Sequence, residues 1–351
     1  MRKRAAVVLV VGLLAGPAGC SGGDPSPPVA APAATTAAPR PSPTPTPPPK
    51  PRPKPPAVNP LTGLRGVPAR PVIAVKIDDT ASGRPQIGLE AADVTYVEQV
   101  EGGATRLVAV FASRQPATVG PVRSVRNNDP ELLAAYRRPA LAYSGGAAGP
   151  VRRLHRSPVV DAGPGAQGGA YRRLTTRPAP YNLVVDTARL AGTVRGASRP
   201  VDVGFRWAGT DPRLDRARKV SRVEVVVGRT RIRFGWEAQG RRWLLLDANG
   251  RARRTTSGKA IATPNVVVPF SRARLDRTNV DVLGTPSVYT STVGAGKLLV
   301  FRDGRVLTGT WQRRHVIYGT HYLDAGRREL TLRPGGAWVL LAATGAPVAY
   351  R

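Results

Sequence analysis

The segment that decides the fold reads DVTYVEQVEGGATRLVAVFA and runs from Asp93 to Ala112. Runs rich in β-branched and other apolar residues stand on both sides of Gly102-Gly103, which is the pattern of two β-strands. The two glycines supply the positive φ angles that a tight turn needs. The segment therefore predicts an antiparallel hairpin with strands over Asp93–Glu101 and Thr105–Ala112.

Glu98 is the residue of this hairpin whose position does not fit an apolar core. On an alternating strand it shares a face with Val94 and Tyr96, so a carboxylate stands in an apolar row. A buried charge needs a partner, because isolated burial costs several kcal/mol. We expect Arg123 or Arg126 to supply that partner.

Two more acidic residues belong to the same candidate set. Glu101 falls on the opposite face, and a two-residue turn would place Arg106 diagonally across from it. Asp78 follows the apolar run Pro71–Ile77, a predicted central strand, and α/β sheets tend to place ligand contacts there. The set forms either a polar cleft for an anionic or sugar ligand, or ion pairs that pin the hairpin to the sheet. Its members are Asp78, Glu98, Glu101, Arg106, Arg123 and Arg126.

Two enzyme hypotheses remain open, a glycosidase and a serine hydrolase, and the sequence commits to neither set of catalytic residues. A glycosidase would use Glu98 and Glu101, about 5–5.5 Å apart if retaining and about 6.5–9.5 Å apart if inverting. A serine hydrolase would use Ser144, but Ala142 stands where the Gly-x-Ser-x-Gly elbow needs its first glycine.

The same serine has a second interpretation. Ser144-Gly145-Gly146 precedes a basic stretch and could form an anion-binding nest at the start of a helix. The alternative is an ordinary loop. The basic residues are Arg152, Arg153 and Arg156.

The sequence predicts no metal and no cofactor. The histidines, His155, His315 and His321, form no His-Glu-x-x-His pattern. The Gly-x-Gly patterns near Gly163 and Gly294 lack the strand-to-helix context of a nucleotide fingerprint.

The rest of the chain predicts an α+β protein. Helices are expected over Pro130–Arg138, with Asp129 as N-cap, and over Thr187–Val194. Beyond residue 200, short β-branched runs separated by Gly and Asn-Gly turns indicate an antiparallel barrel or sandwich. We therefore predict a mixed α/β domain over 59–205 and a mainly antiparallel β domain over 206–351. The expected C-terminal hairpins are Val220–Val227 with Thr230–Trp236, Lys297–Phe301 with Arg305–Trp311, and Leu330–Leu332 with Trp338–Leu341.

The N-terminus predicts export. Arg2, Lys3 and Arg4 precede an apolar run to Gly16, and small residues lead to Cys20, the single cysteine of the 351 residues. This arrangement resembles the lipobox of bacterial lipoproteins, which implies a signal peptide over 1–19 and lipidation of Cys20. A lipidated thiol forms no disulfide and binds no metal.

Residues 20–58 predict a tether. Fifteen of the 34 residues in Pro25–Val58 are proline, a composition that forms no core and extends to about 100 Å. The formal charge of +31 points to a polyanion, and outside the cytoplasm we expect an envelope polymer rather than nucleic acid. The excess of 46 Arg over 7 Lys is also typical of GC-rich coding bias.

Segments spread over both halves of the chain form one recognisable set: they include Asn59–Gly63, Val75–Asp78, Arg84–Gln86, Val100–Gly103, Val119–Ser124, Asn265–Val268 and Gly309–Trp311. Together they resemble the YerB-like lipoproteins, a bacterial envelope family whose N- and C-terminal halves have no known function. The resemblance implies a tethered two-domain envelope protein without an established reaction. We predict a lipid-anchored protein on the outer face of the cytoplasmic membrane that binds a wall glycan, an anionic polymer or a partner protein without catalysis; the alternative is a hydrolase of cell-wall carbohydrate that uses Glu98 or Glu101. Asn127-Asn128 and Tyr181-Asn182 depart from the family pattern.

Overall fold

The hairpin predicted around Gly102-Gly103 forms strands β2 (Val94–Gln99) and β3 (Thr105–Phe111) in the computed structural model, which describes residues 57–280 and 284–351. Gly102 and Gly103 have φ angles of 64° and 78°. The turn is one residue longer than the predicted two-residue type, because Glu101 joins the glycines in a short 3-10 turn. The backbone N–H of Val100 closes it by donating to Ala104 O at 2.8 Å.

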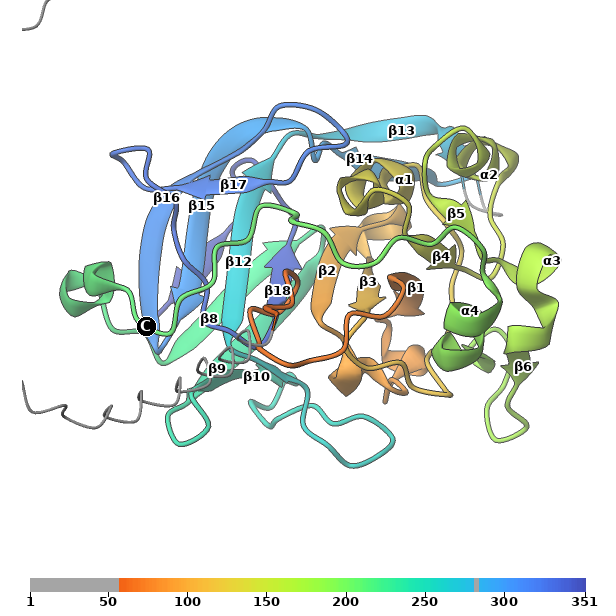
Figure 1. Cartoon of the computed structure of the whole chain (residues 1–351), viewed down its shortest axis with the longest axis horizontal. Helices are drawn as coiled ribbons and strands as arrows, with labels where there is room; N and C mark the ends of the chain where they lie inside the picture. The colour runs from red at the N-terminus through yellow and green to blue at the C-terminus, as the bar shows by residue number, and fades with distance from the viewer. Residues whose placement is uncertain (1–56, 281–283) are drawn as a thin grey trace, which may run out of the picture. The chain divides into compact units, whose positions relative to one another are not determined.

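This hairpin lies in the middle of a sheet that has 11 strands among the described residues (Figure 1). The sheet combines strands of both halves of the chain, and β1, the predicted central strand, is buried along its whole length. In spatial order the strands are β17 (His321–Leu323), β16 (Arg305–Arg313), β15 (Gly294–Arg302), β12 (Asn265–Ser271), β18 (Ala337–Leu340), β2, β3, β1 (Ile73–Asp78), β4 (Ala140–Ala142) and β5 (Val160–Asp161), with β19 (Ala342–Ala343) beside β12.

A second, five-stranded sheet packs on one face of the first. Aromatic rings join the two layers: Phe234 meets Trp338 with ring centroids 5.7 Å apart, and Trp243 meets Phe301 at 6.0 Å. Burying such rings is a main source of stability in a layered fold. The five strands are β11 (Ala262–Thr263), β10 (Arg242–Leu246), β9 (Thr230–Glu237), β8 (Arg222–Val227) and β20 (Val348–Tyr350).

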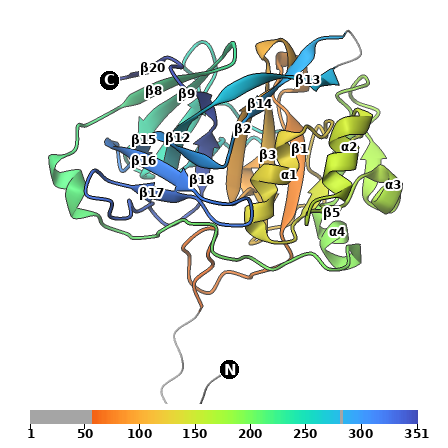
Figure 2. The ribbon, with the colours of Figure 1, turned by 90° about the horizontal axis from the view of Figure 1, so that it is seen from above.

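The helices gather beside the strands of the N-terminal half (Figures 1 and 2). The predicted helix at Thr187–Val194 is present, and Asp186 caps it by accepting from the backbone N–H of Arg189. The predicted N-cap Asp129 is wrong: it lies inside its helix and is buried, because a lysine of the sheet holds its carboxylate. The helices are α1 (Asn128–Leu133), α2 (Ala148–His155), α3 (Pro164–Gln167) and α4 (Thr187–Thr193), and a 3-10 turn (Ala134–Tyr136) continues α1.

The structure confirms the α+β class with a mainly β C-terminal part. It corrects one predicted hairpin: Trp338 belongs to β18, which runs parallel between β12 and β2 instead of returning on Leu330–Leu332. The register places Ala337 opposite Val94 of the N-terminal half. Strands of the two predicted domains thus share one sheet, and the boundary between residues 205 and 206 stays a prediction.

Two smaller ribbons complete the described fold. β13 (Ala273–Val280) pairs with β14 (Pro286–Thr290), and β6 (Tyr171–Arg173) pairs with β7 (Leu183–Val185). The β13–β14 ribbon reaches from the C-terminal half to α2 (Figures 1 and 2).

No helix within residues 57–280 and 284–351 is long and apolar enough to cross a membrane. The predicted signal peptide, the lipidation site Cys20 and the tether up to residue 56 lie outside the described residues.

Candidate functional site

One face of the central sheet changes from apolar to charged along its strands. Glu98 of β2 lies directly opposite Arg106 of β3, which lies opposite Asp78 of β1. The neighbouring row of the same face holds Tyr96 and Lys76, both buried. Glu98 therefore shares a face with Tyr96, as the alternation predicts. The charged row lies at the edge of the sheet where β2 and β1 end.

The partner of Glu98 is Lys76, which the sequence reasoning missed. The Lys76 ammonium forms an ion pair with Glu98 and a 2.8 Å hydrogen bond to Asp129 Oδ1, and all three side chains are fully buried. The prediction that Arg123 or Arg126 pairs with Glu98 is wrong, because Lys76 lies nearer on the same sheet face. Burial lowers the pKa of Lys76 to about 8, although Asp129 opposes that shift.

Asp78 organises two of the predicted arginines. Its Oδ2 lies 2.8 Å from Arg123 Nε and 3.7 Å from Arg106 Nη2, and its Oδ1 accepts from the Thr80 N–H at 2.6 Å. Asp78 is fully buried, whereas the Arg123 and Arg106 side chains are partly exposed. The buried carboxylate of Asp78 thus contacts both guanidinium groups from the protein interior. The opposite sides of the two guanidinium groups face solvent.

Glu101 pairs with Arg126 and not with Arg106. Arg126 donates from Nε to Oε1 at 2.6 Å and from Nη2 to Oε2 at 2.7 Å, a bidentate arrangement. The predicted diagonal contact with Arg106 is wrong, because the three-residue turn changes the direction of the Glu101 side chain. Although burial opposes ionisation, the hydrogen bonds and charge of Arg126 hold the pKa of Glu101 below its ordinary value.

These arginines line an open cleft of about 630 Å³, which we call the first cleft. Its volume lies within the range of ligand pockets, about 300–1,000 Å³. Five of the six predicted site residues lie in its lining or directly behind it, whereas Glu98 lies deeper in the sheet beside Lys76. The first cleft is lined by Arg106, Val122, Arg123, Ser124, Arg126, Ser144, Gly146, Ala147, Arg173, Pro180, Leu183, Asn279 and Val280.

Positive charge is in excess in the first cleft. Four arginines line it, and the two carboxylates that pair with them are Asp78 and Glu101. Arg173, an exposed residue of β6, was missed by the sequence reasoning. No local pattern marks it, because only the fold of the β6–β7 ribbon brings it to the cleft.

The start of α2 forms part of the wall. Ser144 and Gly146, from the predicted anion nest, line the first cleft together with Ala147, the N-cap of α2. The basic stretch after them lines a different cleft, described below. A helix start contributes partial positive charge to such a wall.

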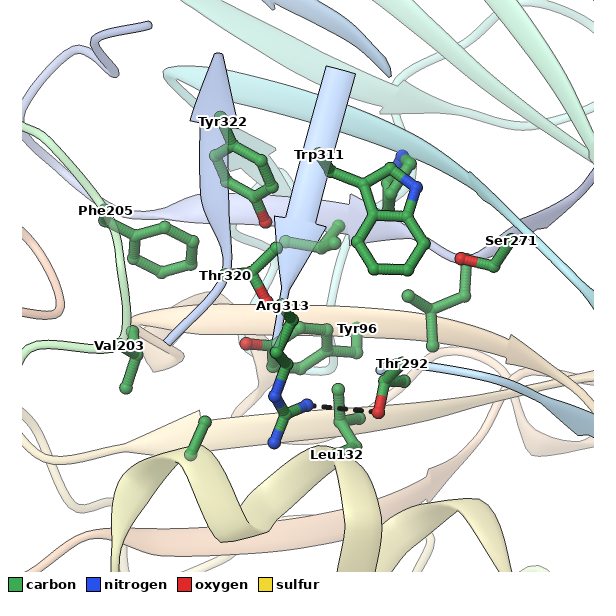
Figure 3. Close-up of a pocket in the computed structure, with 14 residues that line it drawn as sticks. Tyr96, Leu132, Val203, Phe205, Ser271, Thr292, Trp311, Arg313, Thr320 and Tyr322 are labelled. Carbon is green, nitrogen blue, oxygen red and sulfur yellow. Dashed lines mark hydrogen bonds between the residues drawn. The ribbon is translucent and has the colours of Figure 1, made fainter. Parts of the chain in front are cut away.

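The enclosed pocket under the β16–β17 strands is structural (Figure 3). Its volume of about 30 Å³ holds one or two water molecules. Arg313 points into it and is fully buried. Its guanidinium donates to Thr292 Oγ1 at 3.0 Å, to Glu131 O at 2.8 Å and to Tyr318 O at 2.9 Å. Those donors are used within the protein, so the pocket offers no ligand site of useful size.

The enzyme hypotheses gain no support from the geometry. Glu98 is fully buried. Glu101 forms a bidentate ion pair with Arg126, and 9% of the Glu101 side chain is exposed. A Ser144 hydrolase would need His155 or another histidine as base, and within the described residues no hydrogen bond joins Ser144 to a histidine; His155 pairs with Asp161 at 2.7 Å. Within the described part of the chain, His, Cys, Asp and Glu residues form no cluster able to hold a metal.

Comparisons with known proteins match most of the described fold. Residues 61–199 match the family model "Protein of unknown function (DUF3048) N-terminal domain", and residues 223–339 match the corresponding C-terminal domain. The first cleft draws its arginines from the part that the N-terminal model covers.

Two matches lead to the same bacterium. The chain is 46% identical over 70 residues to "Putative lipoprotein YerB" of Bacillus subtilis (strain 168), a match over 19% of this chain and 21% of that protein. The crystal structure of the YerB protein from Bacillus subtilis superposes with a TM-score of 0.69 at 21% identity, over 83% of this chain and 98% of that one. With both family models matched in order, the chain belongs to the YerB-like family of proteins of unknown function.

Proposed function

We propose that this protein is an extracytoplasmic, lipid-anchored module that binds an anionic component of the cell envelope through the first cleft, without catalysis. The observation that carries the proposal is the excess of arginine over carboxylate in an open cleft of about 630 Å³. Arginine is the residue best suited to bidentate recognition of phosphate and carboxylate groups.

Asn279 adds a second observation. Its side chain lines the first cleft and is 3% exposed, and its amide nitrogen has no hydrogen-bond partner among the described residues. A buried donor without a partner costs free energy in the empty state. A bound anion would supply the missing acceptor.

Burial of the acidic residues favours binding over hydrolysis. A glycosidase needs one carboxylate to protonate the leaving group and a second to act as base or nucleophile. Glu98 is committed to Lys76 and Glu101 to Arg126, so both stabilise the walls of the cleft instead. Cell-wall carbohydrate hydrolysis through this pair remains the less favoured candidate.

Titration calorimetry of the full-length protein with inorganic pyrophosphate tests the binding site. Arg173→Gln, combined with Arg123→Gln, should weaken binding about tenfold or more, because a hydrogen bond to a charged group contributes about 1.5–3 kcal/mol. Arg173 alone is the gentler variant, since Arg173 is exposed and its described partner is the uncharged amide of Asn182.

The control removes the same charge elsewhere. Arg195 and Arg251 are exposed and do not line the cleft, so their double replacement by Gln should leave pyrophosphate affinity within about twofold. Equal losses in the two double variants would reduce the binding to unspecific attraction by a chain of charge +31.

The lipid anchor is a separate part of the proposal. It rests on Cys20 after an apolar export segment and on the name of the Bacillus relative, a putative lipoprotein. Replacing Cys20 by Ala should release the protein from the membrane fraction into the medium, because the acyl chains supply the anchoring energy. Membrane fractionation of this variant like the wild type would contradict lipidation.

A further inference from the structure

A second basic cleft of about 530 Å³ lies between α1 and α2. Three arginines line this second cleft: Arg152 and Arg153 belong to α2, and Arg156 is the residue directly after it. Arg153 stacks on the ring of Tyr289 at 5.1 Å and lies 3.6 Å from Glu131. No other described residue is hydrogen-bonded or ion-paired to the guanidinium of Arg152 or Arg156, and both side chains are exposed.

Glu131 is the acidic residue that lines the second cleft, and both of its carboxylate oxygens already accept hydrogen bonds. Its Oε1 accepts from the N–H and the Oγ1 of Thr292, both at 2.9 Å, and its Oε2 accepts from the Tyr289 hydroxyl. The arginines of the second cleft therefore keep an excess of positive charge, as they do in the first.

The two clefts share a wall that is one backbone thick. Arg126 lines the first and the next residue, Asn127, lines the second. On β13, Asn279 lines the first cleft, and Thr278, the residue before it, lines the second. Neighbouring Cα atoms are about 3.8 Å apart, so the clefts lie side by side.

This wall is polar where Asn127 and Thr278 form it. Thr278 is exposed, and Gly149 of α2 packs against it without a side chain. A Cβ atom on Gly149 would lie 3.1 Å from Thr278 O, so the helix and the β13 ribbon touch at backbone level. Asn127 ties the wall together by donating from Nδ2 to Asp276 Oδ2 at 2.5 Å.

We propose that the two clefts together bind one linear polyanion, whose successive phosphate groups occupy both clefts across the Asn127–Thr278 wall. The inference rests on the proposed function of the first cleft and names its ligand class as a polymer with repeated phosphates. Linking two weak sites raises affinity through effective concentration, without new contacts at either site.

The test compares inorganic phosphate chains of different length on the full-length protein. Wild-type protein should bind chains of some tens of phosphates at least tenfold more tightly than pyrophosphate, after correction for the number of binding positions per chain. The second-cleft variant, Arg152→Gln with Arg156→Gln, should lose most of this length preference and keep its pyrophosphate affinity.

Two outcomes would overturn the inference and leave the first cleft intact. One is an unchanged length preference in the second-cleft variant. The other is an equal loss in the charge-matched Arg195→Gln, Arg251→Gln control.

Failure of the proposed function has a different signature. If the wild type binds neither pyrophosphate nor short phosphate chains, the first cleft is not an anion site. If the wild type binds pyrophosphate and the Arg123→Gln, Arg173→Gln variant does not, the first cleft is an anion site. That conclusion does not depend on how affinity changes with the length of the phosphate chain.

Discussion

Lys76 is the residue on which the charged end of the central sheet depends. It is fully buried between Glu98 and Asp129, two carboxylates from different elements. The second oxygen of Asp129 accepts from the backbone N–H of Arg126 at 2.6 Å. The buried triad therefore positions the chain segment that carries Arg123 and Arg126 into the first cleft.

Replacing Glu98 by Gln should lower the free energy of unfolding by about 3 kcal/mol, because breaking a buried ion pair leaves Lys76 with one carboxylate. Pyrophosphate binding by the folded fraction should not change. Denaturant titration measures the first and calorimetry the second. Glu237→Gln is the matched control: its pair with Arg242 is exposed, so the cost should stay below about 1 kcal/mol. Wild-type stability with lost binding or turnover would assign Glu98 a direct role.

Asp211 gives a pH dependence with a defined sign. Although burial opposes ionisation, hydrogen bonds from Arg213 and Thr331 lower the pKa of Asp211 from 3.8 to about 2. A depressed pKa contributes stability that is present above pH 4 and is lost as the pH falls through about 2. Solvent screens part of it, because Arg213 is 26% exposed.

Replacing Asp211 by Asn should therefore lower the free energy of unfolding at pH 7 on the order of 1–2 kcal/mol. Urea titrations at several pH values between 2 and 7 measure it. The wild type and the variant should converge near pH 2. Parallel curves over the whole range would exclude Asp211 as the group responsible.

At the scale of elements, the two glycines of the β2–β3 turn, Gly102 and Gly103, differ in their surroundings, although the sequence pattern gives both the same role. Both have positive φ, which costs an alanine roughly 1 kcal/mol. A Cβ on Gly102 would meet nothing within 4 Å, whereas one on Gly103 would lie 2.6 Å from Arg229 Cγ. The Gly103 carbonyl also accepts from the backbone N–H of Arg229 at 2.7 Å. The turn thus packs against the β8–β9 turn of the C-terminal half.

We expect Gly102→Ala to cost about 1 kcal/mol and Gly103→Ala about 2 kcal/mol or more, since overpacking adds to the backbone cost. Chemical denaturation of the two variants measures the difference. A larger loss at Gly102 would show that backbone strain, and not contact with Arg229, dominates at this turn.

At the scale of the whole molecule, β18 joins the two halves. It pairs in parallel with β2 on one side and with β12 on the other. Without it, β2 would present an unpaired edge of buried residues, including Tyr96 and Val97. Each half therefore depends on the other for its central sheet.

Residues 59–205 expressed alone should fail to fold, because they lack β18 and the second sheet. Near-ultraviolet circular dichroism should show no fixed aromatic packing, and mixing with residues 206–351 should restore it. The intact chain under the same conditions is the control. A cooperative thermal transition in the isolated 59–205 fragment would instead support the predicted domain boundary.

Local sequence patterns were enough to predict several elements of the fold. β-Branched and apolar runs on either side of Gly102-Gly103 located β2 and β3, and β-branched runs across Gly228 and around Gly304 located two C-terminal hairpins. The two-residue period of a strand also placed Glu98 on the same face as Tyr96. These features depend on neighbours a few residues apart, and the periods of strands and helices make them visible in the sequence.

By itself, then, the sequence determined β1, the β2–β3 hairpin, two C-terminal hairpins, the turn glycines and a set of charged residues near one end of the central strands. Only the tertiary structure decided which charges meet. Lys76 reaches Glu98 because β3 lies between β1 and β2, and Arg173 reaches the first cleft because a separate ribbon folds over it. Such contacts follow from strand order and loop length, which depend on how all layers pack together and leave no periodic trace in the chain.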